Sequence, residues 1–343
     1  MVFMETFMKN PVVYVGIVSY HSASLMDACL KALNRQTYKK VLISVWDNAN
    51  EHRVKQISHT HRAAYHGSQK NLGFGAAHNA IIRTLHLKDS DYYLALNPDA
   101  VLEPMFIKEL VKALEINGAG WATGTLYRNK GTKELYSVGH AVQRDGYAYN
   151  IGFGLRDIGQ YDSRRTVFGA PGAAALYSAP LIRTITRKGQ FFDENIFLYY
   201  EDIDVDWRAN KAGFHCLYVP TALGLHRGGT PPISLEAEIL ANRFYVLLKN
   251  ADTRSLWYLF PLVTAHCLFR LFTSPATGIR LCTLVPRALM RALIARKQNA
   301  YQHDMNHWFT IATQEQTRQP RTYAERLRAY TSHIFHNSTG RRE

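Results

Sequence analysis

Cysteine is scarce in this chain of 343 residues, and it also lacks long apolar runs. The four cysteines, Cys29, Cys216, Cys267 and Cys282, include no pair at the C-x-x-C spacing of a zinc or redox site, so we expect reduced thiols. No uninterrupted run of about 18 apolar residues is present, which argues against a transmembrane helix. The N-terminus lacks the apolar stretch of a secretory signal. These absences predict a cytoplasmic protein.

Acidic residues are in the minority. The chain has 27 Asp and Glu against 41 Lys and Arg, which gives a net charge of +14 with histidine neutral. Such an excess suits nucleic acid, an anionic membrane surface or an anionic substrate as a partner. From residue 255 onward, 12 Lys and Arg stand against 4 Asp and Glu, spaced through apolar sequence rather than gathered in one block. The hydrophobic content of 47% excludes a disordered chain.

Several nucleotide and hydrolase motifs are missing. The loop at Gly73 and Gly75 is not a dinucleotide fingerprint, because the third glycine position of G-x-G-x-x-G is His78. By itself this loop is equally well explained as a glycine turn that begins a helix. The chain has no Walker A sequence and no G-x-S-x-G nucleophile elbow.

The order of apolar segments predicts a parallel α/β sheet. Strands are expected at 12–19, 41–46 and 92–96, with helices between and after them at 24–36, 76–87 and 104–116. A β-meander is expected over 120–154, an acidic helix start near 201 and a further strand at 215–219. Ligands of such sheets bind beyond the carboxyl ends of the strands, so the residues that follow each strand require the closest attention.

Those residues are polar. Asp47 follows the second strand and is as well suited to a turn as to a contact with a pyrimidine base. Asp99 follows the third strand and a proline-fixed turn, where a carboxylate could share a divalent cation with a diphosphate. Its alternative role is to cap the helix at Pro104, although it lies several residues too early. A lone His226 is more often structural, but paired with a carboxylate it would suit Mg²⁺ or Mn²⁺.

Four acids occur within six residues at 201–206, just after the aromatic run Phe197-Leu198-Tyr199-Tyr200. Acids in a first helical turn complement the helix dipole, but four exceed what capping requires. The apolar setting would raise a carboxylate pKa toward the range of a general base.

Taken together, these motifs resemble glycosyltransferase family 2, and within it the rhamnosyltransferase-like members that make bacterial polysaccharides. The resemblance covers residues 12–250 and rests on DNA-N, N-x-GFG-x-A-x-N, NPD, a small-residue loop, YYEDIDVDWR and a late LHR. It implies the GT-A nucleotide-diphospho-sugar transferase fold, with a mostly parallel central sheet flanked by helices. It also implies an inverting, metal-dependent transfer of a sugar, with rhamnose as the first candidate, to a hydroxyl of a glycan or lipid-linked acceptor.

The resemblance also implies roles for individual residues. Asp202 would be the catalytic base, and Asp99 and His226 would hold Mg²⁺ or Mn²⁺. The acceptor would contact Gly172, Glu201 and Trp207. The donor, a dTDP- or UDP-sugar, would be bound by Ser19, Tyr20, Asp47, Asn71, Gly73, Phe74, Asn79 and Asn97. The turn after Asp47 and the histidines at 21 and 78 depart from the family pattern.

We expect a catalytic domain at 1–230 and a basic helical region at 231–343, with a weak boundary near Thr230-Pro231-Pro232. Within 281–294, apolar residues are interleaved with arginines; Arg280, Arg287 and Arg291 are spaced to share one helical face. This pattern fits a helix that lies on the inner face of the cell membrane. It fits equally well a core helix or a contact between copies of the chain.

Two other functions are compatible with parts of the sequence. A nucleic-acid-binding protein is suggested by charge alone, but no helix-turn-helix, zinc finger or RNA-binding motif is visible, so no nucleic acid is expected. An inactive GT-A scaffold is opposed by the joint presence of Asp99, Asp202 and His226.

Overall fold

The computed structural model describes residues 11–129, 131–228, 233–251 and 256–296, together with 305, 308 and 309. The expected boundary at 230–232 lies outside these residues. The elements follow one another as β1 (Val13–Ser19), α1 (Ala23–Asn34), β2 (Val41–Asp47), α2 (His52–Thr60), β3 (Ala64–Gly67), α3 (Phe74–Arg83), β4 (Tyr92–Leu96), β5 (Ala100–Leu102), α4 (Phe106–Asn117), β6 (Trp121–Asn129), β7 (Glu134–Ser137), β8 (His140–Val142), β9 (Ala148–Asn150), β10 (Thr166–Val167), β11 (Ala174–Ser178), α5 (Ala179–Ile185), α6 (Glu201–Lys211), β12 (Cys216–His226), a 3₁₀ turn (Ile233–Leu235), α7 (Glu236–Asn250), α8 (Leu256–Thr273) and α9 (Pro275–Arg296).

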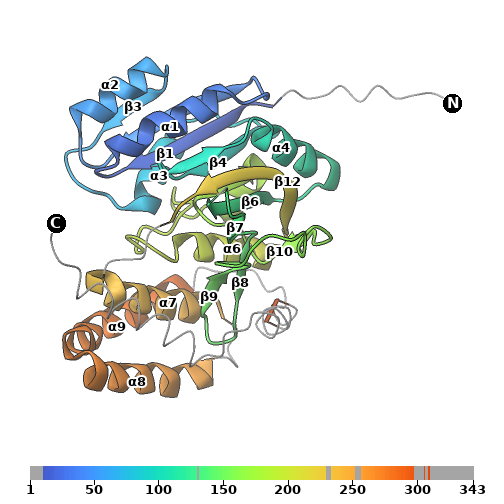
Figure 1. The fold of residues 1–343 in the computed structure, drawn as a ribbon. Helices are drawn as coiled ribbons and strands as arrows, with labels where there is room; N and C mark the ends of the chain where they lie inside the picture. Colours follow the sequence, from blue (N-terminus) through green and yellow to red (C-terminus); the bar gives the residue numbers. More distant parts are fainter. Residues whose placement is uncertain are drawn as a thin grey trace.

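A large twisted sheet organises the N-terminal two thirds of the chain (Figure 1). Its strand order is β10-β12-β6-β11-β4-β1-β2-β3, with β5 paired to β12 and β7 paired to β6. The half formed by β3, β2, β1 and β4 is parallel. In the other half, β11 runs antiparallel to both β4 and β6, while β12 runs parallel to β6. The expected strand-helix alternation and the GT-A type of sheet are confirmed.

Helices cover both faces of this sheet because the strands are apolar on both sides. One core cluster joins the sheet to α1 and α4, through residues such as Met26, Leu30 and Phe106. A second cluster joins the opposite face to α3, α5 and α6, through residues such as Ile81 and Leu181. Burial on both faces explains why the strands read as continuous apolar runs rather than as alternating patterns.

The strand register aligns the polar residues that end the strands. Ser19 pairs with Asp47, and Asp47 pairs in turn with Gly67 on β3. On the other side, His226 pairs with Ala100 at the start of β5. The carboxyl ends of β1, β2 and β4 therefore form one edge. The pairing of β5 with β12 places His226 opposite Ala100, next to Asp99.

Several elements were not expected from the sequence, among them β11 in the small-residue segment, and α2 and β3. The segment of α2, HRVKQISHT, buries only Val54 and Ser58, so its apolar periodicity is weak. The four-residue β3 has no fully buried position. The expected meander is present as β6 with β7 and as the hairpin of β8 and β9, and the strand expected at 215–219 continues to His226.

Among the C-terminal helices, α7 and α9 contribute residues to a cluster with α6, and α8 packs on α7 and α9 (Figure 1). A third cluster joins Ile203 and Trp207 of α6 to Tyr245, Val246 and Leu247 of α7, and includes Ala292 of α9. A fourth cluster joins α7, α8 and α9 to one another. Among the described residues, no helix combines the length and hydrophobicity needed to cross a membrane.

Candidate active site

The loop after β2 is built around the Asp47 carboxylate. Its Oδ1 accepts the Ala49 N–H at 3.0 Å, and its Oδ2 accepts the Glu51 N–H at 2.6 Å and the Tyr65 hydroxyl at 3.1 Å. Asp47 is fully buried at the sheet edge. This carboxylate therefore fixes the turn that replaces the family pattern, and it lies beside Ser19 in the strand register.

Asn48 was missed by the sequence reasoning and ties two loops together. Its Oδ1 accepts the Leu72 N–H at 3.0 Å, and its Nδ2 donates to the Gly73 carbonyl at 3.0 Å. Its backbone N–H also donates to the Ser19 carbonyl at 2.8 Å. The ends of β1 and β2 are thus joined to the loop that precedes α3. The signal that could have found Asn48 is its position directly after Asp47.

The loop before α3 approaches the segment that precedes α6. Asn71 Oδ1 accepts the Gly73 N–H at 2.9 Å, and the Phe74 N–H donates to the Phe197 carbonyl at 3.0 Å. Gly73 has φ of +81°, and a Cβ there would lie 2.2 Å from the Phe197 carbonyl oxygen. Glycine is therefore required at this position for both conformation and space. The contact places Phe74 near Gly172, because a Cβ on Gly172 would lie 3.1 Å from the Phe74 ring.

Asp99 and His226 meet at the same edge. Asp99 Oδ1 lies 3.1 Å from His226 Nε2, which is also 3.1 Å from Asn97 Nδ2. Burial would raise the pKa of Asp99, but the hydrogen bond and charge of His226 and two backbone N–H groups more than offset it, so the pKa is lowered. Asn97 in turn donates its backbone N–H to the Ala173 carbonyl. The predicted pair thus faces the small-residue loop.

Tyr136 of β7 lies close to His226 and interacts with the charges of both Asp99 and Asp202, although no sequence motif marks it. Its ring packs edge-on against His226 with centroids 4.3 Å apart. Burial raises the pKa of Tyr136 to about 12, a hydrogen bond from Asn150 opposes this, and the charges of Asp202 and Asp99 raise it further. The same phenol thus responds to both carboxylates.

Asp202 lies in the first turn of α6 and its carboxylate is fixed by backbone. Oδ2 accepts the Gly172 N–H at 3.0 Å, and Oδ1 accepts the Ile203 N–H at 2.9 Å. The side chain keeps 20% of its surface exposed, in contrast to the fully buried Asp204 and Asp206. Gly172 therefore orients Asp202 through its backbone, and a carboxylate surface remains open for chemistry.

Glu201, the neighbour of Asp202, has a different character. Burial raises the pKa of Glu201 well above its usual range, and the charge of Asp202 raises it further. In the described part of the chain, its Oε2 has no hydrogen-bond partner. The raised pKa favours the neutral form of Glu201, which sets it apart from the partly exposed Asp202.

The assignment of Trp207 to the acceptor is corrected by the structure. Its side chain is completely buried, with its ring 6.0 Å from the rings of Phe168 and Phe309. In α6, five residues advance about 140° beyond a full turn, so Trp207 points away from the face that carries Asp202. Trp207 therefore belongs to the core between α6 and the C-terminal helices.

One other predicted donor contact, Asn79, is committed to a loop outside the gathered groups, whereas Tyr20 directly follows Ser19 at the end of β1. Asn79 is buried in α3, where it accepts the N–H groups of Phe191 and Phe192 and donates to the Phe192 carbonyl and to Glu194. The side-chain amide of Asn79 is thus hydrogen-bonded through both its oxygen and its nitrogen to the loop at 191–194. Tyr20 is 53% exposed and contacts His21.

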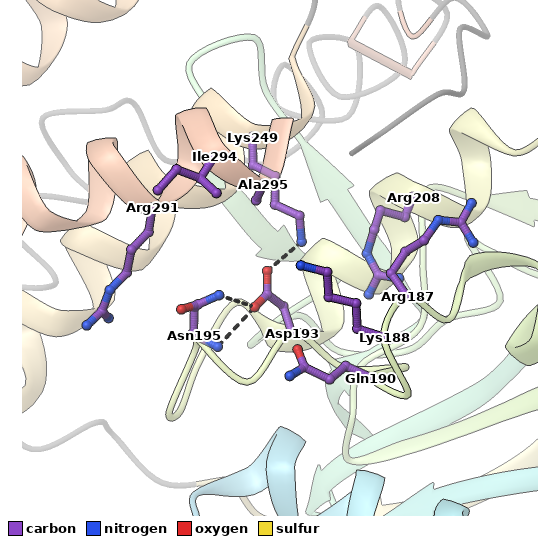
Figure 2. A pocket seen from close by; sticks show the side chains of 10 residues that line it. All are labelled: Arg187, Lys188, Gln190, Asp193, Asn195, Arg208, Lys249, Arg291, Ile294 and Ala295. Atoms are coloured by element: carbon purple, nitrogen blue, oxygen red, sulfur yellow. Dashed lines mark hydrogen bonds and ion pairs between the residues drawn. The ribbon is translucent and has the colours of Figure 1, made fainter. Parts of the chain in front are cut away.

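A cavity of about 350 Å³ lies elsewhere, between the loop after α5 and the helices α7 and α9 (Figure 2). It contains none of the predicted site residues. Lys249 donates there to Asp193 at 2.6 Å and to Asp204 at 2.8 Å. Lys188 and Arg291 also line it, and both are exposed.

Asp99 and His226 form a two-residue donor set for a cation. The described residues contain no cluster of three or more His, Cys, Asp or Glu side chains able to hold a metal. Adjacent ligands of an octahedral cation with bonds of about 2.1 Å are separated by about 3 Å, and the observed Oδ1–Nε2 distance is 3.1 Å. The pair thus fits a Mg²⁺ or Mn²⁺ ion that takes its other ligands from phosphate and water.

The fold has a counterpart among solved structures. It superposes on the crystal structure of GalNAc-T7 with UDP, GalNAc and Mn²⁺ with a TM-score of 0.58 and 12% sequence identity. The match covers 73% of this chain and 50% of that one, so the chain spans half of that solved chain. This likeness shows that the chain has the GT-A fold.

The sequence comparisons identify the family. The profile of glycosyl transferase family 2 matches residues 14–185, and the chain belongs to that family. It is 27% identical over 229 residues to "Rhamnosyltransferase WbbL" of Escherichia coli K12, covering 62% of this chain and 83% of that protein. It is also 27% identical over 270 residues to "N-acetylglucosaminyl-diphospho-decaprenol L-rhamnosyltransferase" of Mycobacterium tuberculosis, covering 72% and 87%. The chain is a glycosyltransferase.

Proposed function

We propose that this enzyme transfers a sugar from a nucleotide-diphosphate donor to an acceptor hydroxyl in one displacement that inverts the anomeric carbon. The observation that carries the proposal is the Asp202 carboxylate, held by the Gly172 N–H at 3.0 Å and partly open to solvent. Asp202 takes the proton of the acceptor hydroxyl as the oxygen attacks the anomeric carbon. The bond from that carbon to the diphosphate breaks, and its electron pair leaves with the nucleotide.

A single catalytic carboxylate is enough for this reaction. Hydrolysis of glycosides uses two carboxyl groups, one of which protonates the leaving group. A nucleoside diphosphate leaves without protonation when its charge is offset. Glu201, the carboxyl next to Asp202, is buried, and burial raises its pKa, which supports one base rather than a pair.

The nucleotide side is assigned to the edge formed by β1, β2 and the loop before α3. Ser19, Asp47, Asn71, Gly73 and Phe74 lie along it, joined through Asn48. Asp99 and His226 would hold Mg²⁺ or Mn²⁺ through Oδ1 and Nε2, with Asn97 beside them. When bound, the cation offsets the charge that develops on the departing diphosphate.

The donor and acceptor are proposed from the relatives. Rhamnose carried by dTDP is the first candidate donor, with UDP-sugars next, because both curated relatives are named rhamnosyltransferases. The mycobacterial name specifies a diphospho-decaprenol acceptor. A glycan or lipid-linked hydroxyl in bacterial polysaccharide synthesis is therefore the acceptor we propose for this chain.

A lipid-linked acceptor agrees with the surface of the C-terminal helices. Phe272 of α8 is 85% exposed, and Ile279, Met290 and Ile294 of α9 are each more than 60% exposed. Arg280 is committed to Glu238 and the Ser234 carbonyl, whereas Arg287 and Arg291 are exposed. We propose that this surface lies on the cytoplasmic face of the membrane, with arginines at lipid phosphates. A contact between copies of the chain is the competing use.

Vesicle co-sedimentation separates these uses. Binding to vesicles of phosphatidylcholine and phosphatidylglycerol that exceeds binding to phosphatidylcholine alone supports the membrane role. The double variant Phe272→Glu, Met290→Glu should lose that binding. Ile116→Glu, at a 70% exposed position of α4, is the matched control. A wild-type chain that ignores vesicles but forms dimers in sedimentation would instead favour the contact between copies.

The transferase reaction is tested by nucleotide binding together with one substitution. A thermal-shift titration with dTDP, UDP and GDP, each with Mn²⁺ or EDTA, should show metal-dependent stabilisation by one pyrimidine nucleotide. Asp202→Asn should keep that shift and lower kcat by about 10²–10⁴-fold. Asp89→Asn, at an exposed position, is the control. Binding of DNA without any nucleotide response would favour the nucleic-acid alternative, and nucleotide binding without transfer by the unaltered enzyme would favour an inactive scaffold.

A further inference from the structure

Three titratable side chains form a line that begins at Asp202 and leads into the protein. His140, the first residue of β8, lies between two acids of α6: its Nε2 is 3.8 Å from Asp202 Oδ2, and its Nδ1 is 2.9 Å from Asp206 Oδ2. Because Asp202 and Asp206 are four residues apart, they occupy the same face of the helix. The ring of His140 therefore connects an open carboxylate to a buried one.

The inner end of this line is rigidly held. Asp206 is fully buried, and its Oδ1 accepts the Trp121 Nε1–H at 2.9 Å and the Ala170 N–H at 3.2 Å. That leaves Oδ2 for His140. A Cβ on Gly169 would lie 1.7 Å from Asp206 Oδ2, so the chain has a glycine where the carboxylate must fit. Asp206 is thus a fixed anchor for the imidazole.

The charges favour an imidazolium at His140. Burial alone would lower the pKa of His140, but Asp202 and Asp206 more than offset burial and raise it. For Asp206, burial raises the pKa to about 7, while the hydrogen bond and charge of His140 oppose that rise. A positive ring that donates one N–H to Asp206 directs its other N–H toward Asp202.

Among the described residues, the ion pairs give Asp202 no cationic partner besides His140. Four other titratable groups in the described part of the chain interact with the charge of Asp202, and none of them is a cation. They are Glu201 and Asp206 of α6, Tyr136 of β7 and Tyr177 of β11.

We propose that His140 is a positioning residue for the transfer reaction: anchored by Asp206, it orients the Asp202 carboxylate toward the acceptor and places a positive charge beside it. The proposal rests on the proposed role of Asp202 as the base. In the transfer step the acceptor proton moves to Asp202, the acceptor oxygen bonds to the anomeric carbon, and the diphosphate departs with the electrons of the broken bond. His140 keeps its protons throughout and supplies charge and direction.

The test is the pH dependence of kcat for His140→Gln and His140→Asn. Without the neighbouring cation, the acid limb of the profile should move to higher pH by about one unit or more. Donor KM should stay within about twofold, and activity should recover above the shifted limb. A uniform loss of kcat at every pH, with no shift of the limb, would overturn the proposal and leave His140 a structural role.

Two controls sharpen the result. Trp121→Phe removes the other side-chain donor to Asp206 and leaves His140 in place, so its acid limb should match the unaltered enzyme. An equal shift in Trp121→Phe would mean that general loosening of the site causes the effect, and would overturn the proposal. Asp206→Asn should reproduce the shift of His140→Gln, because it removes the anchor's charge.

A measurement on folded wild-type protein keeps the proposal testable if the His140 variants fail to fold. NMR of ¹³C-labelled histidines should reveal an imidazole whose pKa lies above 6.5 and falls in Asp202→Asn. The absence of any such imidazole would overturn the proposal. If Asp202→Asn retains full activity, the assignment of the base fails and the role of His140 fails with it; if Asp202→Asn is inactive while the His140 profile is unshifted, only the inference about His140 fails.

Discussion

Asn48 donates from Nδ2 to the Gly73 carbonyl at 3.0 Å and so joins the end of β2 to the loop that begins α3. The loop is further fixed by Phe74, whose N–H donates to the Phe197 carbonyl. Residues at the proposed nucleotide edge are thereby connected to the segment that leads into Asp202. These hydrogen bonds therefore connect the proposed nucleotide contacts to the segment that carries the proposed base, Asp202.

Substitution of Gly73 should disturb both stability and donor binding. Gly73→Ala combines a φ of +81° with a contact of 2.2 Å to the Phe197 carbonyl oxygen. We expect a loss of about 1–3 kcal/mol in unfolding free energy, measured by urea denaturation, together with weaker nucleotide binding. Gly118→Ala is the matched control, since Gly118 has φ of +61° but open space around it. Equal losses in the two variants, with donor affinity intact, would contradict this reading.

Metal removal should affect nucleotide binding through Asp99 and His226. Asp99→Asn and His226→Ala each remove one of the two protein donors, so we expect the Mn²⁺-dependent affinity for a nucleoside diphosphate to fall by at least about tenfold. Isothermal titration with Mn²⁺ and then with EDTA measures this loss. Asp89→Asn, at the surface, should behave as the unaltered chain. Variants that bind metal and nucleotide normally would remove both residues from the metal site.

The spacing of motifs predicted the sheet well and the site only in part. Asp99 and Asp202 follow from strand ends and an acidic helix start. The contact between Asp99 and His226 could not be derived from spacing, because it depends on pairing of β5 with β12 across 126 intervening residues. Trp207 follows Asp202 by five residues, which turns its side chain about 140° away from Asp202 and into the core. The same geometry would have placed Asp206 on the face of Asp202.

His140 and Tyr136 had no sequence signal at all. Both lie on short strands of the meander, where neither periodicity nor a motif marks a functional position. Their roles arise from tertiary contacts with α6 and β12. Such contacts become visible only when the strands are placed in space.

Loss of the Lys249 cation should be costly. Lys249→Met leaves Asp193 and Asp204 buried without their shared partner, so we expect a loss of about 3–5 kcal/mol in unfolding free energy. Lys188→Met lines the same cavity at an exposed position (Figure 2) and should change stability little. Urea denaturation at neutral pH compares the two. Similar midpoints for both variants would contradict the assigned role.

The ion pair between Lys249 and Asp193 also makes the unfolding free energy depend on pH in the acid range. Burial opposes ionisation of Asp193, but Lys249 and the Tyr245 hydroxyl more than offset burial and lower its pKa. A lowered folded-state pKa contributes stability above the unfolded value near 3.9, and the contribution is lost as the pH falls below that value.

A second pH effect is expected from His78 in the core. Its Nδ1 lies 2.6 Å from the Tyr93 hydroxyl, and burial lowers its pKa to about 3. In the unfolded chain this histidine takes up a proton near pH 6.5, whereas in the folded chain it stays neutral down to about pH 3. The unfolding free energy therefore keeps its full value above pH 6.5 and falls by about 1.4 kcal/mol per pH unit between pH 6.5 and about pH 3. His78→Gln should remove one proton from this dependence, measured by urea denaturation at pH 7, 6 and 5. His52→Gln on α2 controls for the loss of an exposed imidazole, and an unchanged slope in His78→Gln would contradict the assignment.

The position of Lys249 bears on where this enzyme can be shortened. The family profile ends at residue 185 and the expected boundary lies near 230, yet the lysine that pairs with both Asp193 and Asp204 is supplied by α7, while Arg208 of α6 pairs with Asp204. A fragment that stops at 230 would carry two buried carboxylates with no lysine to meet them. The smallest piece able to fold on its own should therefore include α7 and also α9, because Ala292 of α9 packs in the same cluster as Trp207 of α6.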